Sequence, residues 1–125
     1  MSKVLIIDDS AVARMRCRNE LEDLGHEVVE ANNGEQGLEQ AAREMPDLVV
    51  LDLLMPGQAG SSVLAELQVR YPALPVIVMS ADSQQRTREN CLQLGAKAVI
   101  NKFRDKDEFP RTIQEVLDAQ QQDQT

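Results

Sequence analysis

The sequence predicts an α/β protein in which a five-stranded parallel sheet is doubly wound, with five helices covering its two faces. Short apolar runs alternate with longer amphipathic segments, and most of the runs are continuously apolar and rich in Val and Ile. Strands buried on both faces have this composition. Strict alternation of strands with helices then predicts parallel strands joined by right-handed crossovers.

Five apolar runs are predicted to be strands. They occupy residues 4–7, 27–31, 48–51, 76–79 and 98–100. Only the second run, which follows His26, alternates in part between apolar and polar side chains. This half-buried pattern is typical of a strand at the edge of a sheet.

The segments between these runs have helical spacing, with apolar residues three or four positions apart. The pattern covers about residues 13–24, 38–45, 64–71, 87–94 and 109–117. Gly25 is a C-terminal stop for the first helix. Pro110 is tolerated in the first turn of the last helix if Asp107 is its N-cap. Cys17 and Cys91 fall among the apolar positions, so we expect both to be small buried thiols.

Length and composition predict a single domain. The 125 residues contain 42% hydrophobic and 27% charged side chains, an ordinary globular composition. No linker, repeat or low-complexity block divides the chain. We therefore expect one domain over residues 1–119 and a polar, disordered tail over residues 120–125.

Charge and hydropathy exclude several classes of function. Thirteen basic and twenty-one acidic side chains give a net charge of −8, and nucleic-acid phosphates repel a chain of this charge. No apolar run approaches the roughly 20 residues that span a bilayer, and the first run is too short for a signal peptide. The two cysteines lack metal-ligand spacing. We expect a cytoplasmic protein with reduced thiols that binds neither nucleic acid nor membrane.

Chemically active side chains stand at the carboxyl ends of four predicted strands, where open α/β sheets form their sites. Asp8 and Asp9 follow the first strand, and Asp52 ends the third. Ser80 ends the fourth strand, and Lys102 follows the fifth. We therefore expect three carboxylates, one hydroxyl and one ammonium to converge on one edge of the sheet.

Some of these residues also have purely structural explanations. Asp8 and Asp9, with Ser10, suit the N-terminus of a helix, and a lone serine or lysine is ordinary on a surface. Asp52 is harder to explain in this way, because a carboxylate among apolar residues is costly unless it is paired or metal-bound. The whole set is poorly explained by chance.

The set predicts phosphoryl transfer. Three crowded carboxylates repel one another and raise each other's pKa values, and Mg²⁺, which prefers oxygen ligands, relieves that repulsion. The carboxylate of Asp52 could then attack phosphorus and form an acyl phosphate. Lys102 and Ser80 would compensate charge on the phosphoryl oxygens, and such a reaction needs little more than positioning.

Four segments carry a resemblance to a known family. They are residues 5–10 (LIIDDS), 52–57 (DLLMPG), 78–81 (VMSA) and 94–102 (LGAKAVINK). In this order, over about residues 3–118, the chain resembles the bacterial response-regulator receiver domain, in its stand-alone, chemotaxis-type form. The resemblance implies a flavodoxin-like sheet with strand order 2-1-3-4-5 and a role in two-component phosphorelay signalling.

The same resemblance implies a phosphoprotein that takes its phosphoryl group on Asp52 from a histidine kinase or phosphotransfer protein. It is then no enzyme in the usual sense, although it catalyses its own phosphorylation and dephosphorylation. Mg²⁺ would be held by Asp9, Asp52 and the backbone carbonyl of Leu54, with Asp8 acting through water. A downstream protein would dock on the face made by the fourth helix, the fifth strand and the fifth helix.

Two positions depart from the family pattern. Val99 replaces the usual aromatic residue three positions before the lysine, and Phe103 replaces the proline that usually follows Lys102 through a cis peptide. We expect a trans peptide here, because a cis bond without proline costs ~2.5–4 kcal/mol, and we expect the following loop to carry the signal. Leu54 and Phe103 should shield the acyl phosphate from water, whereas Asp82 would shorten its lifetime if it orients that water.

Three other functions compete on sequence alone. A haloacid-dehalogenase-like phosphohydrolase wants a second Asp two residues after its nucleophile, where this chain has Leu54. A flavodoxin-like cofactor carrier wants a Ser-, Thr- or Gly-rich loop after the first strand, where Asp8 and Asp9 would repel phosphate. A phosphate sink or an unreactive pseudo-receiver is compatible with Val99 and Phe103, although the intact five-residue set argues against lost reactivity.

Overall fold

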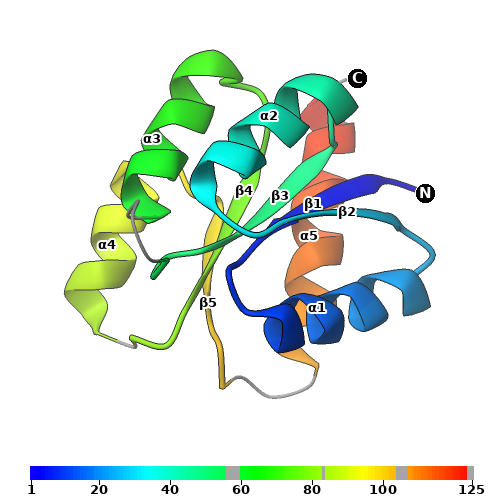
Figure 1. Ribbon diagram of the computed structural model, residues 1–125, viewed down its shortest axis with the longest axis horizontal. Helices are drawn as coiled ribbons and strands as arrows, with labels where there is room; N and C mark the ends of the chain where they lie inside the picture. The colour runs from blue at the N-terminus through cyan, green and yellow to red at the C-terminus, as the bar shows by residue number, and fades with distance from the viewer. Residues whose placement is uncertain (56–59, 83, 104–106, 124–125) are drawn as a thin grey trace.

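The computed structural model describes residues 1–55, 60–82, 84–103 and 107–123. It contains one five-stranded parallel sheet with strand order β2-β1-β3-β4-β5 (Figure 1), so the predicted fold class and strand order are confirmed. The strands are β1 (Lys3–Ile7), β2 (Glu27–Ala31), β3 (Leu48–Asp52), β4 (Val76–Ser80) and β5 (Ala98–Asn101). The helices are α1 (Ala11–Asp23), α2 (Gly34–Glu44), α3 (Gly60–Arg70), α4 (Gln85–Gln93) and α5 (Glu108–Asp123). As predicted, β2 lies at an edge of the sheet.

The helices cover the sheet in two layers, with α1 and α5 on one face and α2, α3 and α4 on the other (Figure 1). Successive side chains of a strand point to opposite faces. Val4 and Ile6 of β1 therefore enter the core beneath α1 and α5, while Leu5 and Ile7 enter the core beneath the other three helices. Burying one such side chain contributes roughly 1.5–3 kcal/mol, so the central strands are held from both sides.

The carboxyl ends of the strands are aligned, and this alignment brings the predicted site residues together. Asp52 is paired with Met79, and Ser80 with Asn101. Strands β3, β4 and β5 each continue one residue past the predicted apolar run. Asp52 and Ser80 therefore belong to the sheet itself, which is a more rigid support than a loop.

Local sequence explains where the first two helices begin and end. The Oγ of Ser10 caps α1 by accepting the N–H of Ala13 at 3.2 Å. The chain leaves α1 through Gly25, whose φ of +87° favours glycine. Helix α2 ends earlier than predicted: Met45 is exposed and left-handed with φ 48°. A proline disfavours the α conformation of the residue before it, and Pro46 follows Met45.

Helix α5 begins as predicted but ends later. The N–H of Arg111 donates to the carbonyl of Asp107 at 3.2 Å, which puts Pro110 in the first turn. The helix reaches Asp123, so the backbone of residues 120–123 is helical where we expected the tail, in keeping with the fair helix propensity of Gln. Residues 124–125 of the predicted tail lie outside the described residues.

The cysteines and the hydropathy of the helices were also the subject of expectations from the sequence. Cys17 and Cys91 are both buried free thiols, as predicted. Cys17, on α1, belongs to the core between the sheet and helices α1 and α5, and Cys91, on α4, belongs to the core on the other face. In the part of the chain that the structure describes, no helix has the length and hydropathy needed to cross a membrane.

Candidate functional site

Four of the five predicted site residues lie close together at the carboxyl edge of the sheet: the three carboxylates and Lys102. The ammonium of Lys102 lies 3.1 Å from Oδ2 of Asp52 and 3.4 Å from Oδ2 of Asp8. Oxygens from Asp8, Asp9 and Asp52 lie within 4.8 Å of one another. Segments far apart in the sequence thus place three acids and one base in a single site.

Asp52 lies at the centre of this site and is only 2% exposed. Its Oδ1 accepts the N–H of Leu54 at 3.3 Å. Its Oδ2 is fully buried and makes no hydrogen bond of good geometry with the described residues, although it forms the ion pair with Lys102. A buried carboxylate oxygen with unused acceptor capacity is suited to bind a cation.

Burial raises the pKa of Asp52 to about 6; the Lys102 ammonium opposes this rise, and the charge of Asp8 adds to it. We expected mutual repulsion of the carboxylates to raise the pKa, but loss of hydration on burial is the larger cause. At pH 7 the carboxylate is mostly ionised, which is the form needed for nucleophilic attack or for metal binding.

Lys102 keeps its charge in this setting. Burial by itself would lower the pKa of its ammonium, but the neighbouring carboxylates of Asp52 and Asp8 outweigh that effect, and the pKa is raised. The backbone N–H of Lys102 donates to the carbonyl of Ser80 at 2.8 Å, which extends the pairing of β4 with β5 and holds the side chain over the sheet edge.

The carboxylate cluster fits a hard divalent cation. Mg²⁺ binds oxygens at 2.0–2.1 Å, so opposite ligands in its octahedron lie about 4.2 Å apart. Neighbouring ligands in the same octahedron lie about 3 Å apart. Oxygens from Asp8, Asp9 and Asp52 lie within 4.8 Å of one another, so direct ligands among them would move closer on binding, whereas an acid that acts through water would not have to. Asp9 is exposed, whereas Asp8 and Asp52 are buried, so the cluster is also open to solvent on one side.

Ser80 lies at the same edge, but its hydroxyl is engaged locally. Its Oγ accepts the N–H of Asp82 at 3.0 Å and donates to the carbonyl of the same residue at 3.3 Å. The carboxylate of Asp82 accepts from Gln84 N–H at 2.9 Å and from the Thr87 hydroxyl at 2.7 Å. These bonds turn the Asp82 carboxylate towards the start of α4, whose N-cap is Gln84.

Gly60, at the start of α3, is a site-supporting residue that the sequence analysis did not single out. A Cβ at this position would lie 2.5 Å from the backbone oxygens of Asp52 and Leu53. The N–H of Gly60 also donates to the carbonyl of Leu53 at 2.9 Å. Because Gly60 has no side chain, α3 can start directly against the strand end that carries Asp52. In the sequence, the only sign of this role is a glycine before a helical pattern.

The two departures from the family pattern lie on either side of Lys102. Val99 is half-buried against the core, and its carbonyl accepts a bond from Arg88 of α4 at 3.0 Å. No cis peptide occurs among the described residues, so the expected trans bond between Lys102 and Phe103 is confirmed. The N–H of Phe103 donates to Oδ1 of Asn101 at 2.7 Å. Most of the loop expected to carry the signal, residues 104–106, lies outside the described residues.

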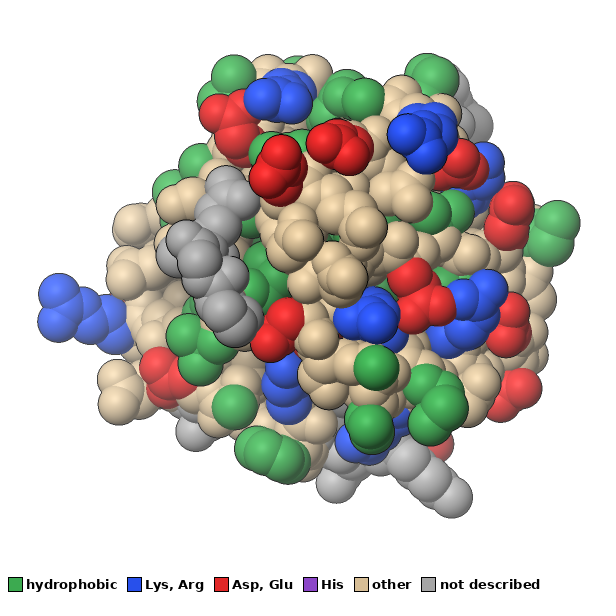
Figure 2. All heavy atoms as spheres, in the orientation of Figure 1, with side chains coloured by type: hydrophobic (Ala, Val, Ile, Leu, Met, Phe, Trp, Pro, Cys, Tyr) green, Lys and Arg blue, Asp and Glu red, His purple; other side chains and the backbone are tan. Residues whose placement is uncertain are grey.

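A groove of about 280 Å³ opens beside the site, lined by Asp8 and Lys102 and flanked by Val12 and Phe103. Val12 is 72% exposed and Phe103 is 82% exposed. On the face shown in Figure 2, hydrophobic side chains are scattered among acidic and basic ones, without one continuous basic area. The site is therefore reached over a mixed surface with an apolar rim.

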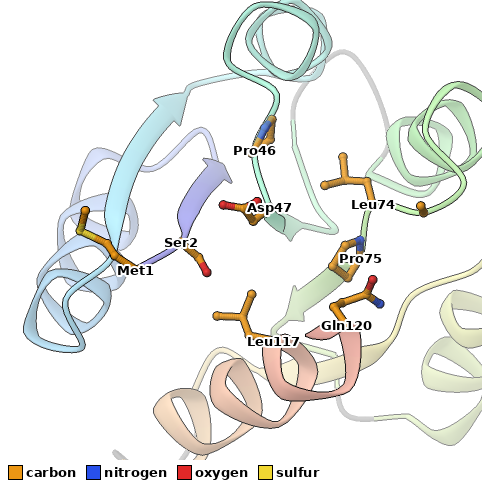
Figure 3. A pocket seen from close by; sticks show the side chains of 9 residues that line it. Met1, Ser2, Pro46, Asp47, Leu74, Pro75, Leu117 and Gln120 are labelled. Atoms are coloured by element: carbon orange, nitrogen blue, oxygen red, sulfur yellow. The ribbon is translucent and has the colours of Figure 1, made fainter. Parts of the chain in front are cut away.

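A second hollow, of about 430 Å³, lies at the opposite end of the strands (Figure 3). Ser2 precedes β1, Asp47 precedes β3 and Pro75 precedes β4, and all three line this hollow together with Leu117 and Gln120 of α5. The carboxylate of Asp47 accepts the N–H of Lys3 at 2.8 Å, which is a structural contact. This hollow is separate from the carboxylate cluster.

The fold and the cluster together define a class of protein: doubly wound α/β domains with an acidic site at the carboxyl edge of the sheet, closed by a basic side chain after the last strand. Comparison with known proteins gives the family within this class. The profile of the response regulator receiver domain matches residues 4–114. The chain belongs to this family.

Individual relatives agree with this assignment. The chain is 33% identical over 119 residues to the protein PilH of Pseudomonas aeruginosa, covering 94% of this chain and 98% of PilH. It is 37% identical over 103 residues to the chemotaxis protein CheY of Listeria monocytogenes, covering 82% and 87%. A CheY-like receiver domain protein from Methanospirillum hungatei has a similar solved structure, with TM-score 0.92 at 25% identity and 98% of each chain covered.

Proposed function

We propose that the chain is a response regulator whose Asp52 accepts a phosphoryl group in a Mg²⁺-dependent reaction. The observation that carries the proposal is the buried Asp52 carboxylate, 3.1 Å from the Lys102 ammonium and clustered with two further carboxylates. Burying charged groups costs free energy of folding, so their presence here points to a functional role. Membership of the receiver family supports the same reaction.

In the proposed reaction, a carboxylate oxygen of Asp52 attacks the phosphorus of a phosphohistidine on a histidine kinase or phosphotransfer protein. The bond between phosphorus and the histidine nitrogen breaks, and its electron pair returns to the imidazole. Asp52 then carries an acyl phosphate. Lys102 shifts from the carboxylates towards a phosphoryl oxygen, and the Ser80 hydroxyl leaves Asp82 to donate to another. Attack of water on phosphorus later breaks its bond to the carboxylate oxygen, which releases inorganic phosphate and restores the free carboxylate.

The residues proposed to hold Mg²⁺ are Asp9, Asp52 and the backbone carbonyl of Leu54, with Asp8 acting through water. When bound, the cation supplies the positive charge that reduces repulsion between the phosphoryl oxygens and the carboxylates. The three acids are present with oxygens inside 4.8 Å, which supports this ligand set.

The phosphorylated form is proposed to act in the cytoplasm by binding a downstream protein on the face made by α4, β5 and α5. Arg88 and Val99 already link α4 to β5 on this face, so a change near Ser80, at the end of the adjacent strand, has a short route to it. A phosphate sink or a pseudo-receiver is the alternative. Val99 favours that alternative, because it has no ring to rotate when the site is phosphorylated.

Mass spectrometry of the intact chain after treatment with acetyl phosphate and Mg²⁺ tests the proposal. One phosphoryl group is expected on the wild type, and none in EDTA or on Asp52→Asn. Wild-type protein that binds Mg²⁺ without gaining mass would be a pseudo-receiver. A pull-down that compares phosphorylated with unphosphorylated protein then separates a signalling regulator, which retains a partner, from a phosphate sink.

A further inference from the structure

The guanidinium of Arg14 bridges two elements beside the acidic site. Its Nε donates to Oε1 of Glu30 on β2 at 3.0 Å, and its NH1 donates to the backbone carbonyl of Asp8 at 2.6 Å. The Arg14 side chain is only 18% exposed, so water competes little for these bonds. A guanidinium suits this role, because its N–H donors are held in one rigid plane and can serve two acceptors at once.

The carbonyl that Arg14 holds belongs to the peptide group between Asp8 and Asp9. The amide of Asp8 donates to the carbonyl of Ala31 at 3.1 Å, and its carboxylate accepts the N–H of Ser10 at 2.9 Å. Asp8 is therefore fixed at its amide, its side chain and its carbonyl. Because the peptide group is planar, fixing the carbonyl also fixes the direction in which the chain enters Asp9.

Asp9 lacks comparable support for its own side chain. It is exposed, and across the described part of the chain no hydrogen bond or ion pair holds its carboxylate. One of its oxygens nevertheless lies within 4.8 Å of those of Asp8 and Asp52. The position of this carboxylate thus depends on its backbone, and a ligand whose backbone is already oriented loses less freedom on binding.

We propose that Arg14 is a positioning residue for the cation site, fixing the peptide between Asp8 and Asp9 so that the Asp9 carboxylate faces the cation. The inference rests on the proposed function, since it takes Asp8, Asp9 and Asp52 as the cation-binding acids. Arg14 touches neither the cation nor the phosphoryl group. Its loss should therefore weaken Mg²⁺ binding and leave the reaction intact once Mg²⁺ is saturating.

Arg18 provides a matched control. It lies one turn further along α1 and pairs with Glu30 and Glu22. Arg18→Ala removes an ion pair to the same glutamate that Arg14 uses, but leaves the carbonyl of Asp8 bonded to Arg14. Arg14→Met is a second test variant, because it keeps the apolar stem of the side chain while removing both bonds.

Isothermal titration of the full chain with Mg²⁺ tests the proposal. Arg14→Ala and Arg14→Met are expected to bind Mg²⁺ about tenfold more weakly, as is usual when an outer partner of a metal ligand is removed. Arg18→Ala should stay within about twofold of the wild type. During labelling with acetyl phosphate, the Mg²⁺ concentration for half-maximal rate should rise by the same factor in the Arg14 variants while the maximal rate is kept. If Arg14→Ala lacks the wild-type circular dichroism spectrum, Arg14→Met carries the test.

Wild-type Mg²⁺ affinity in the folded Arg14 variants would overturn the proposal. An equal loss in Arg18→Ala would also overturn it, because the effect would then come from ion pairing with Glu30 and not from the bond to Asp8. Failure of the wild type itself to bind Mg²⁺ would contradict the proposed function, and the inference with it. Wild-type binding together with unchanged Arg14 variants contradicts the inference alone, so the two failures are distinguishable.

Discussion

The ammonium of Lys102 lies 3.1 Å from Oδ2 of Asp52, although β4 separates the strands that carry the two residues. Lys102 follows β5 while its backbone is still bonded to Ser80, so its side chain crosses the end of β4 at the height of the carboxylate. The same ammonium is 3.4 Å from Asp8. The ammonium of Lys102 therefore compensates the negative charge of two acids, Asp8 after β1 and Asp52 at the end of β3. The burial of the Asp52 carboxylate depends on this compensation.

Asp52→Asn is expected to raise the free energy of unfolding at pH 7 in EDTA. The pKa of Asp52 is raised from 3.8 to about 6, mainly by burial, so the folded state favours the neutral carboxyl. The stability that this preference provides is fully present below about pH 4 and is lost as the pH rises through 6. Asparagine is neutral and similar in size, so it should avoid a cost on the order of 2–3 kcal/mol at pH 7. Urea unfolding from pH 4 to pH 7 measures the difference.

His26 titrates in a neighbouring pH window with the opposite sign. Burial and then the N-terminal amine lower its pKa from 6.5, so its contribution to stability is present above pH 6.5 and lost as the pH falls through the folded-state pKa. Wild type and Asp52→Asn share the contribution of His26, so the difference between their free energies of unfolding reports on Asp52 alone. A difference that stays constant from pH 4 to pH 7 would refute the assigned pKa shift.

Leu54→Asn is expected to shorten the lifetime of the phosphorylated protein severalfold. Leu54 stands two residues after the acceptor, and its N–H contacts the Asp52 carboxylate at 3.3 Å, so a polar side chain there could orient an attacking water. Asp82→Asn is the control. The Asp82 carboxylate is engaged with Gln84 and Thr87, so this substitution should leave the lifetime unchanged. Decay of ³²P-labelled protein gives both rates. Equal lifetimes for Leu54→Asn and wild type would remove the shielding role of Leu54.

Gly60→Ala is expected to destabilise the fold and to slow labelling. Its Cβ would meet the backbone oxygens of Asp52 and Leu53 at 2.5 Å, and backbone cannot move aside as a side chain can. Overpacking of this kind costs about 1–3 kcal/mol. Gly25→Ala is the comparison: its φ of +87° carries strain of about 1–2 kcal/mol, but nothing lies within 4 Å. Urea midpoints should fall for both, whereas only Gly60→Ala should slow labelling by acetyl phosphate.

Phe103→Ser is expected to slow phosphoryl transfer from a protein donor about tenfold while leaving labelling by acetyl phosphate unchanged. Phe103 and Val12 form an exposed apolar rim beside the groove that contains Lys102, and a protein must cover that rim to reach Asp52, whereas a small molecule need not. Exposed aromatic residues often dominate such contacts. Val69→Ser, at an equally exposed position on α3, is the control. Equal slowing with both donors would mean that Phe103 acts on the chemistry and not on docking.

Much of this arrangement follows from the sequence, because parallel strands align their carboxyl ends. Once residues 48–51 and 76–79 were assigned as buried strands, Asp52 and Ser80 had to lie at the same edge. The strand order rested on resemblance to the family, since alternation of elements alone allows several orders. Met45 was misplaced because local proline geometry overrode helical spacing.

Other features depend on contacts between segments distant in the sequence, and no local pattern could show them. The need for glycine at position 60 comes from the approach of α3 to the end of β3. Arg14 resembles the other arginines of α1 in sequence, and only the fold puts its guanidinium against the carbonyl of Asp8. The dominance of burial over repulsion in raising the pKa of Asp52 likewise required the packed structure.

Chemical mapping of the phosphoryl group tests the central claim most directly. Borohydride reduces an acyl phosphate on aspartate to homoserine, so reduction after labelling with acetyl phosphate and Mg²⁺ marks the acceptor residue for peptide mass spectrometry. Homoserine is expected at position 52 alone, and at no position when EDTA replaces Mg²⁺ or when Asp52→Asn is labelled. Homoserine at position 8 or 9 with an unmodified Asp52 would contradict the assignment of the acceptor and, with it, the roles proposed for the surrounding residues.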